Sequence, residues 1–177
     1  MNLDAFVFAD AAPDPPVKVC GPNAGYAEQM LSNIGACNSE MSAVSLYFYN
    51  SVILKPYERE IAQVFHRISL VEMHHLDIFA TLAHQLGANP RLWSYQGRNL
   101  SYWTPGCNQY PRQLLPLLQN ALHGEEQAIA KYREQAEQIG DPYVVALLRR
   151  ILLDEQHHVE IFRELLRTGS GRSSACC

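Results

Sequence analysis

The feature that most constrains the fold is a segment that occurs twice. Residues 72–79 read EMHHLDIF and residues 155–162 read EQHHVEIF, and each copy contains a Glu-x-x-His motif. An upstream pattern of a glutamate, an alanine and a tyrosine is repeated in the same way. Its members are Glu40, Ala43 and Tyr47 in the first copy and Glu125, Ala128 and Tyr132 in the second. Internal repetition of this kind indicates a duplicated structural unit, which we expect to be a helical hairpin.

Helical periodicity supports this expectation. Four long helical patterns lie near residues 26–54, 57–87, 112–139 and 142–167. The first two patterns are joined around Lys55-Pro56, and the last two by Gly140-Asp141-Pro142, where an N-capping aspartate precedes a proline at the first helical position. Because connections this short bring neighbouring helices back alongside each other, each pair is predicted to be antiparallel.

The segment between the two pairs, residues 87–111, has no helical period and is rich in turn residues and aromatic side chains. About 25 extended residues can span ~80 Å, whereas a helix of about 28 residues is only ~42 Å long. The segment can therefore cross the whole length of a bundle, and the second and third helices can run parallel. We expect an all-α four-helix bundle of two antiparallel hairpins joined by a long crossover. The alternative is a simple up-and-down bundle with a bulky loop.

The ends of the chain differ from this central part. Residues 1–25 contain Pro13, Pro15, Pro16 and Pro22 and are predicted to form an irregular arm before a bundle at 26–167. Residues 168–177 form a Gly/Ser-rich tail that is predicted to be flexible and that ends in Cys176 and Cys177.

Composition narrows the possible functions. A chain of 177 residues fits one domain, and it has neither a secretory signal pattern nor the ~20 consecutive apolar residues of a membrane span. The net charge of −4, without a basic cluster, argues against a nucleic acid or an anionic membrane as a partner. The five cysteines match neither a zinc site nor a disulfide framework, so we expect reduced thiols in a cytoplasmic protein.

Each helical pattern has an apolar stripe that should face the bundle core, and each stripe carries a glutamate near its middle. These glutamates are Glu40, Glu72, Glu125 and Glu155. Burial of unpartnered carboxylates costs several kcal/mol apiece, and four converging carboxylates also repel one another. Two divalent cations would cancel their charge, and His75 and His158 would complete the coordination, since residues three apart share a helix face. The sequence therefore predicts a site for two metal ions.

Neighbouring residues are weaker candidates. Glu126 lies on a solvated stripe, so we favour Glu125, and the faces of His74 and His157 favour surface or flanking positions. Asp154 could accept the second N–H of a ligating histidine, but Val71 occupies the matching place in the other copy.

Tyr47 and Tyr132 follow their glutamates on the same stripes. They are either core residues with a satisfied hydroxyl, or catalytic residues that hydrogen-bond a carboxylate or act as redox-active phenols beside the metals.

These motifs resemble those of the ferritin-like di-iron carboxylate superfamily, most closely its rubrerythrin-like branch, over Tyr26 to Leu166. The resemblance implies that Glu72 and Glu155 bridge the metals, that Glu40 and Glu125 are terminal ligands, and that His75 and His158 each supply one nitrogen.

The sequence departs from its relatives in three ways. Rubrerythrins carry a further glutamate where this chain has Ala128, and usually a rubredoxin domain, for which no paired Cys-x-x-Cys is present here. Dimanganese catalases are similar too, but are longer and typically have an arginine at the position of Gly124.

Carboxylate and imidazole ligands suit iron or manganese. The resemblance implies a di-iron oxidase or peroxidase that acts on O2 or H2O2 with an unknown electron donor. A dimanganese catalase-like activity is second, and metal storage or a structural bundle with an incidental ion is the non-enzymatic alternative. Most relatives are dimers, so a homodimer is possible.

Overall fold

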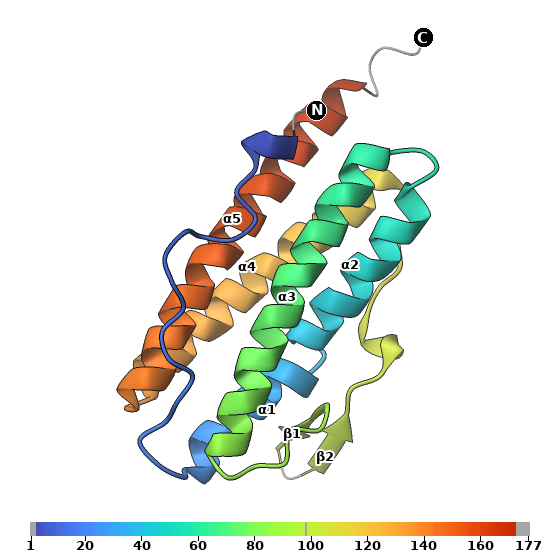
Figure 1. Ribbon diagram of the computed structural model, residues 1–177. Coiled ribbons are helices and arrows are strands. Elements are labelled where there is room, and N and C mark those ends of the chain that lie inside the picture. Colours follow the sequence, from blue (N-terminus) through green and yellow to red (C-terminus); the bar gives the residue numbers. More distant parts are fainter. Residues whose placement is uncertain (1–2, 98, 173–177) are drawn as a thin grey trace.

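The computed structural model describes residues 3–97 and 99–172 (Figure 1). Four long helices form the bundle: α2 (Glu40–Leu54), α3 (Arg59–Gln85), α4 (Leu114–Gln138) and α5 (Pro142–Arg172). Short connections join α2 to α3 and α4 to α5, whereas residues 86–113 run from one end of the bundle to the other, so that α3 and α4 point the same way. The predicted all-α bundle of two hairpins and a long crossover is therefore confirmed. No helix in the described part of the chain is both long and apolar enough to cross a bilayer.

The prediction of a single helix over residues 26–54 is wrong. The chain forms α1 (Ala24–Gly35) and then α2, and residues 36–39 between them are not helical. The break has a tertiary cause, because the backbone of Trp93 from the crossover lies against the Cα of Gly35, where no side chain would fit. The Nζ of Lys131 in α4 also donates to the carbonyl oxygens of Ser32 and Asn38, on either side of the break. The helical periodicity of the sequence continues through this region and does not indicate these contacts.

The crossover contains a small hairpin that the sequence did not lead us to expect. Strands β1 (Trp93–Gln96) and β2 (Asn99–Tyr102) pair antiparallel, with Trp93 opposite Tyr102, and a short 3-10 helix, η2 (Pro105–Cys107), follows. Gly97 begins the turn at φ 63°, a conformation that favours glycine. The hairpin packs beside α1 and so covers the end of the bundle that α2 leaves open.

The start of α5 agrees with the sequence. The Oδ1 of Asp141 accepts hydrogen bonds from the N–H groups of Tyr143 and Val144, so Asp141 caps α5 with Pro142 at its first position, as predicted. The helix continues to Arg172, beyond the expected end at 167, and the cysteines of the tail, Cys176 and Cys177, lie outside the described residues.

The N-terminal arm begins with η1 (Leu3–Ala5) and then runs along α5 to reach α1 (Figure 1).

The core consists of two apolar clusters. The α1-side cluster, which includes Met30, Phe79 and Leu148, joins α1 to α3, α4 and α5. The α2-side cluster, which includes Phe65 and Phe162, joins α2 to the same three helices. The buried polar residues considered below lie at mid-height, between the two clusters.

The close approach at Gly35 leads to a testable prediction. In Gly35→Ala the new methyl group would overlap the backbone nitrogen and carbonyl of Trp93, so the hairpin or α1 must shift. Overpacking of this kind costs about 1–3 kcal/mol, and about 2–4 °C of Tm is lost per kcal/mol in a chain of this size. Thermal unfolding followed by circular dichroism should show this loss. Gly21→Ala is the matched control, because a Cβ there meets no described atom within 4 Å and the Tm should not change.

Candidate metal centre

The six side chains that the sequence proposes as ligands converge inside the bundle. Each of the four long helices contributes one glutamate, and α3 and α5 each add the histidine three residues further on. All six are at most 2 % exposed. They are Glu40, Glu72, His75, Glu125, Glu155 and His158. The structure therefore places the acids inward on all four helices, with the polar layer enclosed by apolar side chains above and below.

Within this layer the ligand atoms form two groups. The first contains Glu40 and His75, the second contains Glu125 and His158, and Glu72 and Glu155 belong to both. In each group the potential ligand atoms lie within 4.8 Å of one another. Each group is thus one hairpin's terminal glutamate and histidine together with two shared carboxylates, which is the arrangement expected for two neighbouring ions.

The histidine nitrogens that face the carboxylates are the two Nδ1 atoms. His75 Nδ1 lies 3.3 Å from Glu72 Oε2 and 3.3 Å from Glu155 Oε1. His158 Nδ1 lies 2.9 Å from Glu72 Oε1 and 3.4 Å from Glu155 Oε2. The terminal glutamates are slightly further away, since Glu40 Oε2 and Glu125 Oε1 are each 3.9 Å from the Nδ1 of their own hairpin's histidine.

The remaining nitrogen of each histidine is held from outside the layer. The Nε2 of His75 lies 3.0 Å from Asp154 Oδ2, so the acceptor comes from the opposite hairpin. The Nε2 of His158 lies 2.9 Å from the carbonyl oxygen of Phe8, in the N-terminal arm. An acceptor at Nε2 keeps the hydrogen there and points the lone pair of Nδ1 at the site, as metal-bound imidazoles require. Sequence reasoning identified Asp154 but not Phe8, because a main-chain carbonyl has no sequence signature.

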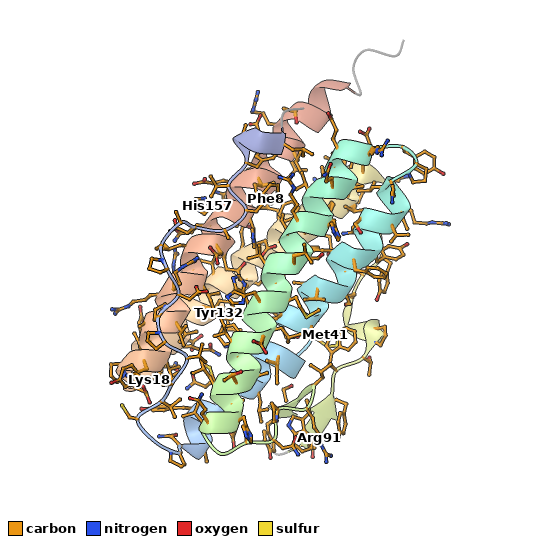
Figure 2. The ribbon with its side chains drawn as sticks, in the orientation of Figure 1. Phe8, Lys18, Met41, Arg91, Tyr132 and His157 are labelled. Atoms are coloured by element: carbon orange, nitrogen blue, oxygen red, sulfur yellow. A yellow bond between two sulfur atoms is a disulfide. The ribbon has the colours of Figure 1, made fainter. Side chains whose placement is uncertain are left out.

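The arm is fixed to α5 by a set of polar contacts. The N–H of Asp10 donates to Asp154 Oδ1 at 2.6 Å, and Arg150 Nη1 donates to the same oxygen at 2.7 Å. Arg150 also donates to the carbonyl oxygens of Asp10 and Ala12. Figure 2 shows Phe8 and His157 where the arm passes over α5. The irregular segment therefore supports the site, which its composition did not suggest.

The histidines set aside in the sequence also contact this arm. The Nε2 of His74 lies 2.7 Å from Asp14 Oδ2, and the Nε2 of His157 lies 3.2 Å from Asp10 Oδ2. Glu126 forms an exposed ion pair with Arg163 at 2.7 Å. All three residues are therefore outside the buried layer, as the sequence indicated.

Tyr47 and Tyr132 connect the two hairpins. The hydroxyl of Tyr47 in α2 donates to Glu125 Oε1 at 2.5 Å, and the hydroxyl of Tyr132 in α4 donates to Glu40 Oε1. Burial raises the pKa of both phenols well above the usual range, so they remain protonated donors. Figure 2 shows Tyr132 within the bundle. Each tyrosine thus binds the terminal glutamate of the other hairpin, so the predicted hydrogen bond to a carboxylate is present, and a catalytic role for the phenols stays a prediction.

The surroundings of the two terminal glutamates favour their protonated forms. Burial, reinforced by the charges of Glu72 and Glu155, raises the pKa of Glu40 well above its usual range, and the same causes raise the pKa of Glu125. Both carboxyl groups therefore keep their protons to a higher pH than an exposed glutamate would.

The central groups behave in the opposite way. Burial would raise the pKa of Glu72, but the charge of His158 and hydrogen bonds with both histidines lower it, and the pKa of Glu155 is lowered too. Burial would lower the pKa of His75 and His158, but the surrounding carboxylates raise it well above the usual value. These shifts favour the ionised form of the two central carboxyl groups and the protonated form of the two imidazoles.

The layer nevertheless leaves ligand atoms unused. Glu72 Oε1, both oxygens of Glu155 and His158 Nδ1 have no well-aligned hydrogen-bond partner among the described residues. These atoms approach one another only as ion pairs of poor hydrogen-bond geometry, so they remain available as ligand atoms for a bound cation. Oxygen and imidazole nitrogen donors suit iron or manganese, and two divalent cations would cancel the charge of four carboxylates. The residues therefore fit a pair of metal ions.

A cavity of about 330 Å³ leads to this layer. Its wall includes the four site glutamates and, nearer the surface, His123 and Gln127 of α4. Gly124 and Ala128 also line it, so the positions that distinguish this chain from its relatives lie on the path to the carboxylates. Small molecules can therefore reach the site between α2 and α4.

The same wall contains a disulfide bond between Cys37 and Cys107. The expectation of reduced thiols is wrong for these two residues, because their pairing depends on how the crossover packs on the helix break and not on any local spacing. Cys20 is an exposed free cysteine.

Comparison with solved structures supports the fold. The manganese catalase KatB from Anabaena superposes with a TM-score of 0.81 at 20% identity, and the match covers 93% of this chain and 81% of that one. A bacterioferritin from Rhodobacter capsulatus, described with a metal-free dinuclear site and heme iron, gives a TM-score of 0.69 at 20% identity over 84% of this chain and 87% of that one. No curated protein sequence matches the chain.

The family model named Rubrerythrin matches residues 34–166, which include all six candidate ligands and both tyrosines. Together with the fold of the two structures above, this match agrees with a dinuclear site of carboxylate and histidine ligands. The chain therefore belongs to the rubrerythrin family of the ferritin-like superfamily.

Proposed function

We propose that the chain binds two iron ions in the buried layer and uses them for oxidation or peroxidase chemistry on O2 or H2O2. The observation that carries this proposal is that Glu72 and Glu155 belong to both ligand groups and have oxygens that make no well-aligned hydrogen bond with the described residues. When bound, two adjacent redox metals can exchange two electrons with O2 or H2O2.

The surrounding residues have distinct roles in this proposal. Glu40, Glu72, Glu125 and Glu155 would hold the two ions together with the Nδ1 atoms of His75 and His158, and Glu72 and Glu155 are the carboxylates common to both ligand groups. Tyr47 and Tyr132 orient the terminal carboxylates by donating hydrogen bonds to them. The cavity admits a molecule the size of peroxide and lets water leave.

A dimanganese catalase-like reaction is the second candidate. It is favoured by the structural similarity to KatB, a manganese catalase. It is also favoured by Ala128, which lies where rubrerythrins carry a further glutamate. The ligand set accepts either metal, so the two reactions must be separated by experiment.

The first prediction concerns metal content. Replacement of a shared carboxylate by alanine, in Glu72→Ala or Glu155→Ala, should abolish tight binding of both ions, because each ion loses a ligand and the charge balance is broken. Metal analysis after gel filtration should find two ions per chain in the wild type and fewer than one in either variant. Glu126→Ala is the control, since Glu126 is exposed and paired with Arg163. A Glu72→Ala protein that retained two tightly bound ions would contradict the shared role of this carboxylate.

The second prediction concerns protons. Because the pKa values of Glu40, Glu125 and both histidines are raised, these groups hold protons to a higher pH than usual and must lose them when metal binds. Metal affinity should therefore increase as pH rises and fall as pH is lowered. Calorimetric titrations in buffers of different ionisation enthalpy should detect protons released per metal bound. A metal affinity that did not change with pH, with no release of protons, would contradict the raised pKa values of these ligands.

The third prediction separates the reactions. The iron-loaded, reduced chain should be oxidised by H2O2 and develop near-ultraviolet ferric absorption. A catalase-like chain loaded with manganese should instead evolve O2 from H2O2 with no added reductant. Uptake of far more than two metals per chain, with assembly into a large shell on gel filtration, would overturn both candidates in favour of storage. Glu72→Ala should give neither signal, whereas Glu126→Ala should behave as the wild type.

A further inference from the structure

The disulfide lies at the boundary between the site and the solvent. Cys37 is in the break between α1 and α2, three residues before Glu40, and Cys107 ends η2 in the crossover. Cys37 is exposed and Cys107 is partly buried, so a reductant in solution can reach the pair. Both residues also line the cavity that contains Glu40, Glu72, Glu125 and Glu155. The two sulfur atoms are thus accessible from outside and share a wall with the carboxylates.

The two cysteines are held together by contacts that do not involve sulfur. Ser42 Oγ donates to the carbonyl oxygen of Cys37 at 2.7 Å and accepts from Trp103 Nε1 at 2.9 Å. Asn108, next to Cys107, donates through Nδ2 to the carbonyl oxygen of Ser42 and to Ser45 Oγ. Since the crossover is bound to α2 on both sides of η2, reduction would leave the two thiols close together. The pair can therefore open and close without rearrangement of the fold.

The proposed peroxidase reaction requires two electrons per peroxide, and a dithiol supplies two electrons when it closes to a disulfide. Accessible disulfides are the ones that exchange readily with external thiols, and disulfides in reducing compartments are usually catalytic or sensing.

We infer that Cys37 and Cys107 are the electron donor of the dinuclear site: their dithiol form reduces the oxidised centre and closes to the observed disulfide. This inference rests on the proposed function and identifies the reductant that it requires. In the overall reaction, one H2O2 and two thiols are converted to two H2O and one disulfide. The O–O bond breaks, the S–S bond forms, and the two thiol protons end in water. A small external dithiol then restores the pair by exchange at the exposed Cys37 sulfur.

The first test uses the metal-free chain. Full-length protein carrying Cys20→Ser, Cys176→Ser and Cys177→Ser retains only the two cysteines of interest. Dithiothreitol without denaturant should reduce the pair, and alkylation followed by mass spectrometry should show two modified cysteines. The circular dichroism spectrum should be unchanged, because Trp103 and Asn108 still hold the crossover. A pair that is reduced only after the chain is unfolded would be structural, and the inference would be overturned.

The second test counts peroxide. The same protein, reduced, loaded with two ferrous ions per chain and kept free of O2, should consume two molecules of H2O2 per chain and lose both thiols. A matched protein with Cys37→Ser and Cys107→Ser added should bind the same amount of iron and consume one molecule. The reduced metal-free protein should keep its thiols over the same time, which excludes direct oxidation by H2O2.

The possible failures can be told apart. If both loaded proteins consume one H2O2 per chain and the thiols remain, the peroxide chemistry stands and the donor assignment is overturned. Continued H2O2 consumption with O2 evolution and intact thiols also overturns it, in favour of catalase chemistry. If the metal-free protein loses its thiols as fast as the iron-loaded protein, H2O2 oxidises the thiols directly without the metal centre, and the inference is overturned. If neither loaded protein consumes H2O2, the proposed function itself is overturned.

Discussion

Charge balance at the centre of the bundle is the constraint on which the other features depend. Four carboxyl groups and two imidazoles lie in a layer with apolar clusters on both sides, where an unbalanced charge would cost several kcal/mol. The pKa shifts show how protons offset this charge: they favour the protonated forms of Glu40, Glu125 and both histidines beside the ionised Glu72 and Glu155. Two divalent cations would cancel the charge of the same four carboxylates. Metal binding would therefore be an exchange of protons for ions.

The segments outside the four helices give this layer its fixed geometry. The arm supplies the acceptor for His158, and Arg150 fixes the arm and Asp154 together, so that both imidazole rings are oriented through their Nε2 atoms. The two acceptors differ, since one is a carboxylate and the other a carbonyl oxygen. A carboxylate acceptor makes the opposite nitrogen more basic than a carbonyl does. The two metal positions are thus alike in their ligands but unequal in the electron density that their histidines supply.

The sequence contained the parts of the site that depend on helical periodicity. Because residues three and four apart share a helix face, the stripes placed Glu40, Glu72, Glu125 and Glu155 together, and the duplicated motif placed the histidines beside them. The long connection at 87–111 was enough to predict the direction of α4. These inferences rest on local spacing, which a single sequence displays directly.

What the sequence did not show depends on contacts between distant segments. The break after Gly35 comes from the backbone of Trp93, the pairing of Cys37 with Cys107 comes from the packing of the crossover, and the acceptor for His158 is a main-chain atom of the arm. None of these has a periodic signature. The two paired cysteines also line the cavity that leads to the buried layer, so the sequence was more informative about the ligands than about the route that leads to them.

The exchange of hydrogen bonds by Tyr47 and Tyr132 has a consequence for the origin of the bundle. Each hairpin supplies a tyrosine that donates to the terminal glutamate of the other hairpin. Each also supplies one shared carboxylate to the other hairpin's ligand group, so neither hairpin forms a complete ligand group alone. Two identical hairpins related by a twofold axis would make every one of these contacts by symmetry. A peptide of half this length that formed a homodimer would therefore contain all six ligand residues and both tyrosines. After fusion of two copies, each half could accumulate its own substitutions, such as Asp154 in one half and Val71 at the matching position of the other.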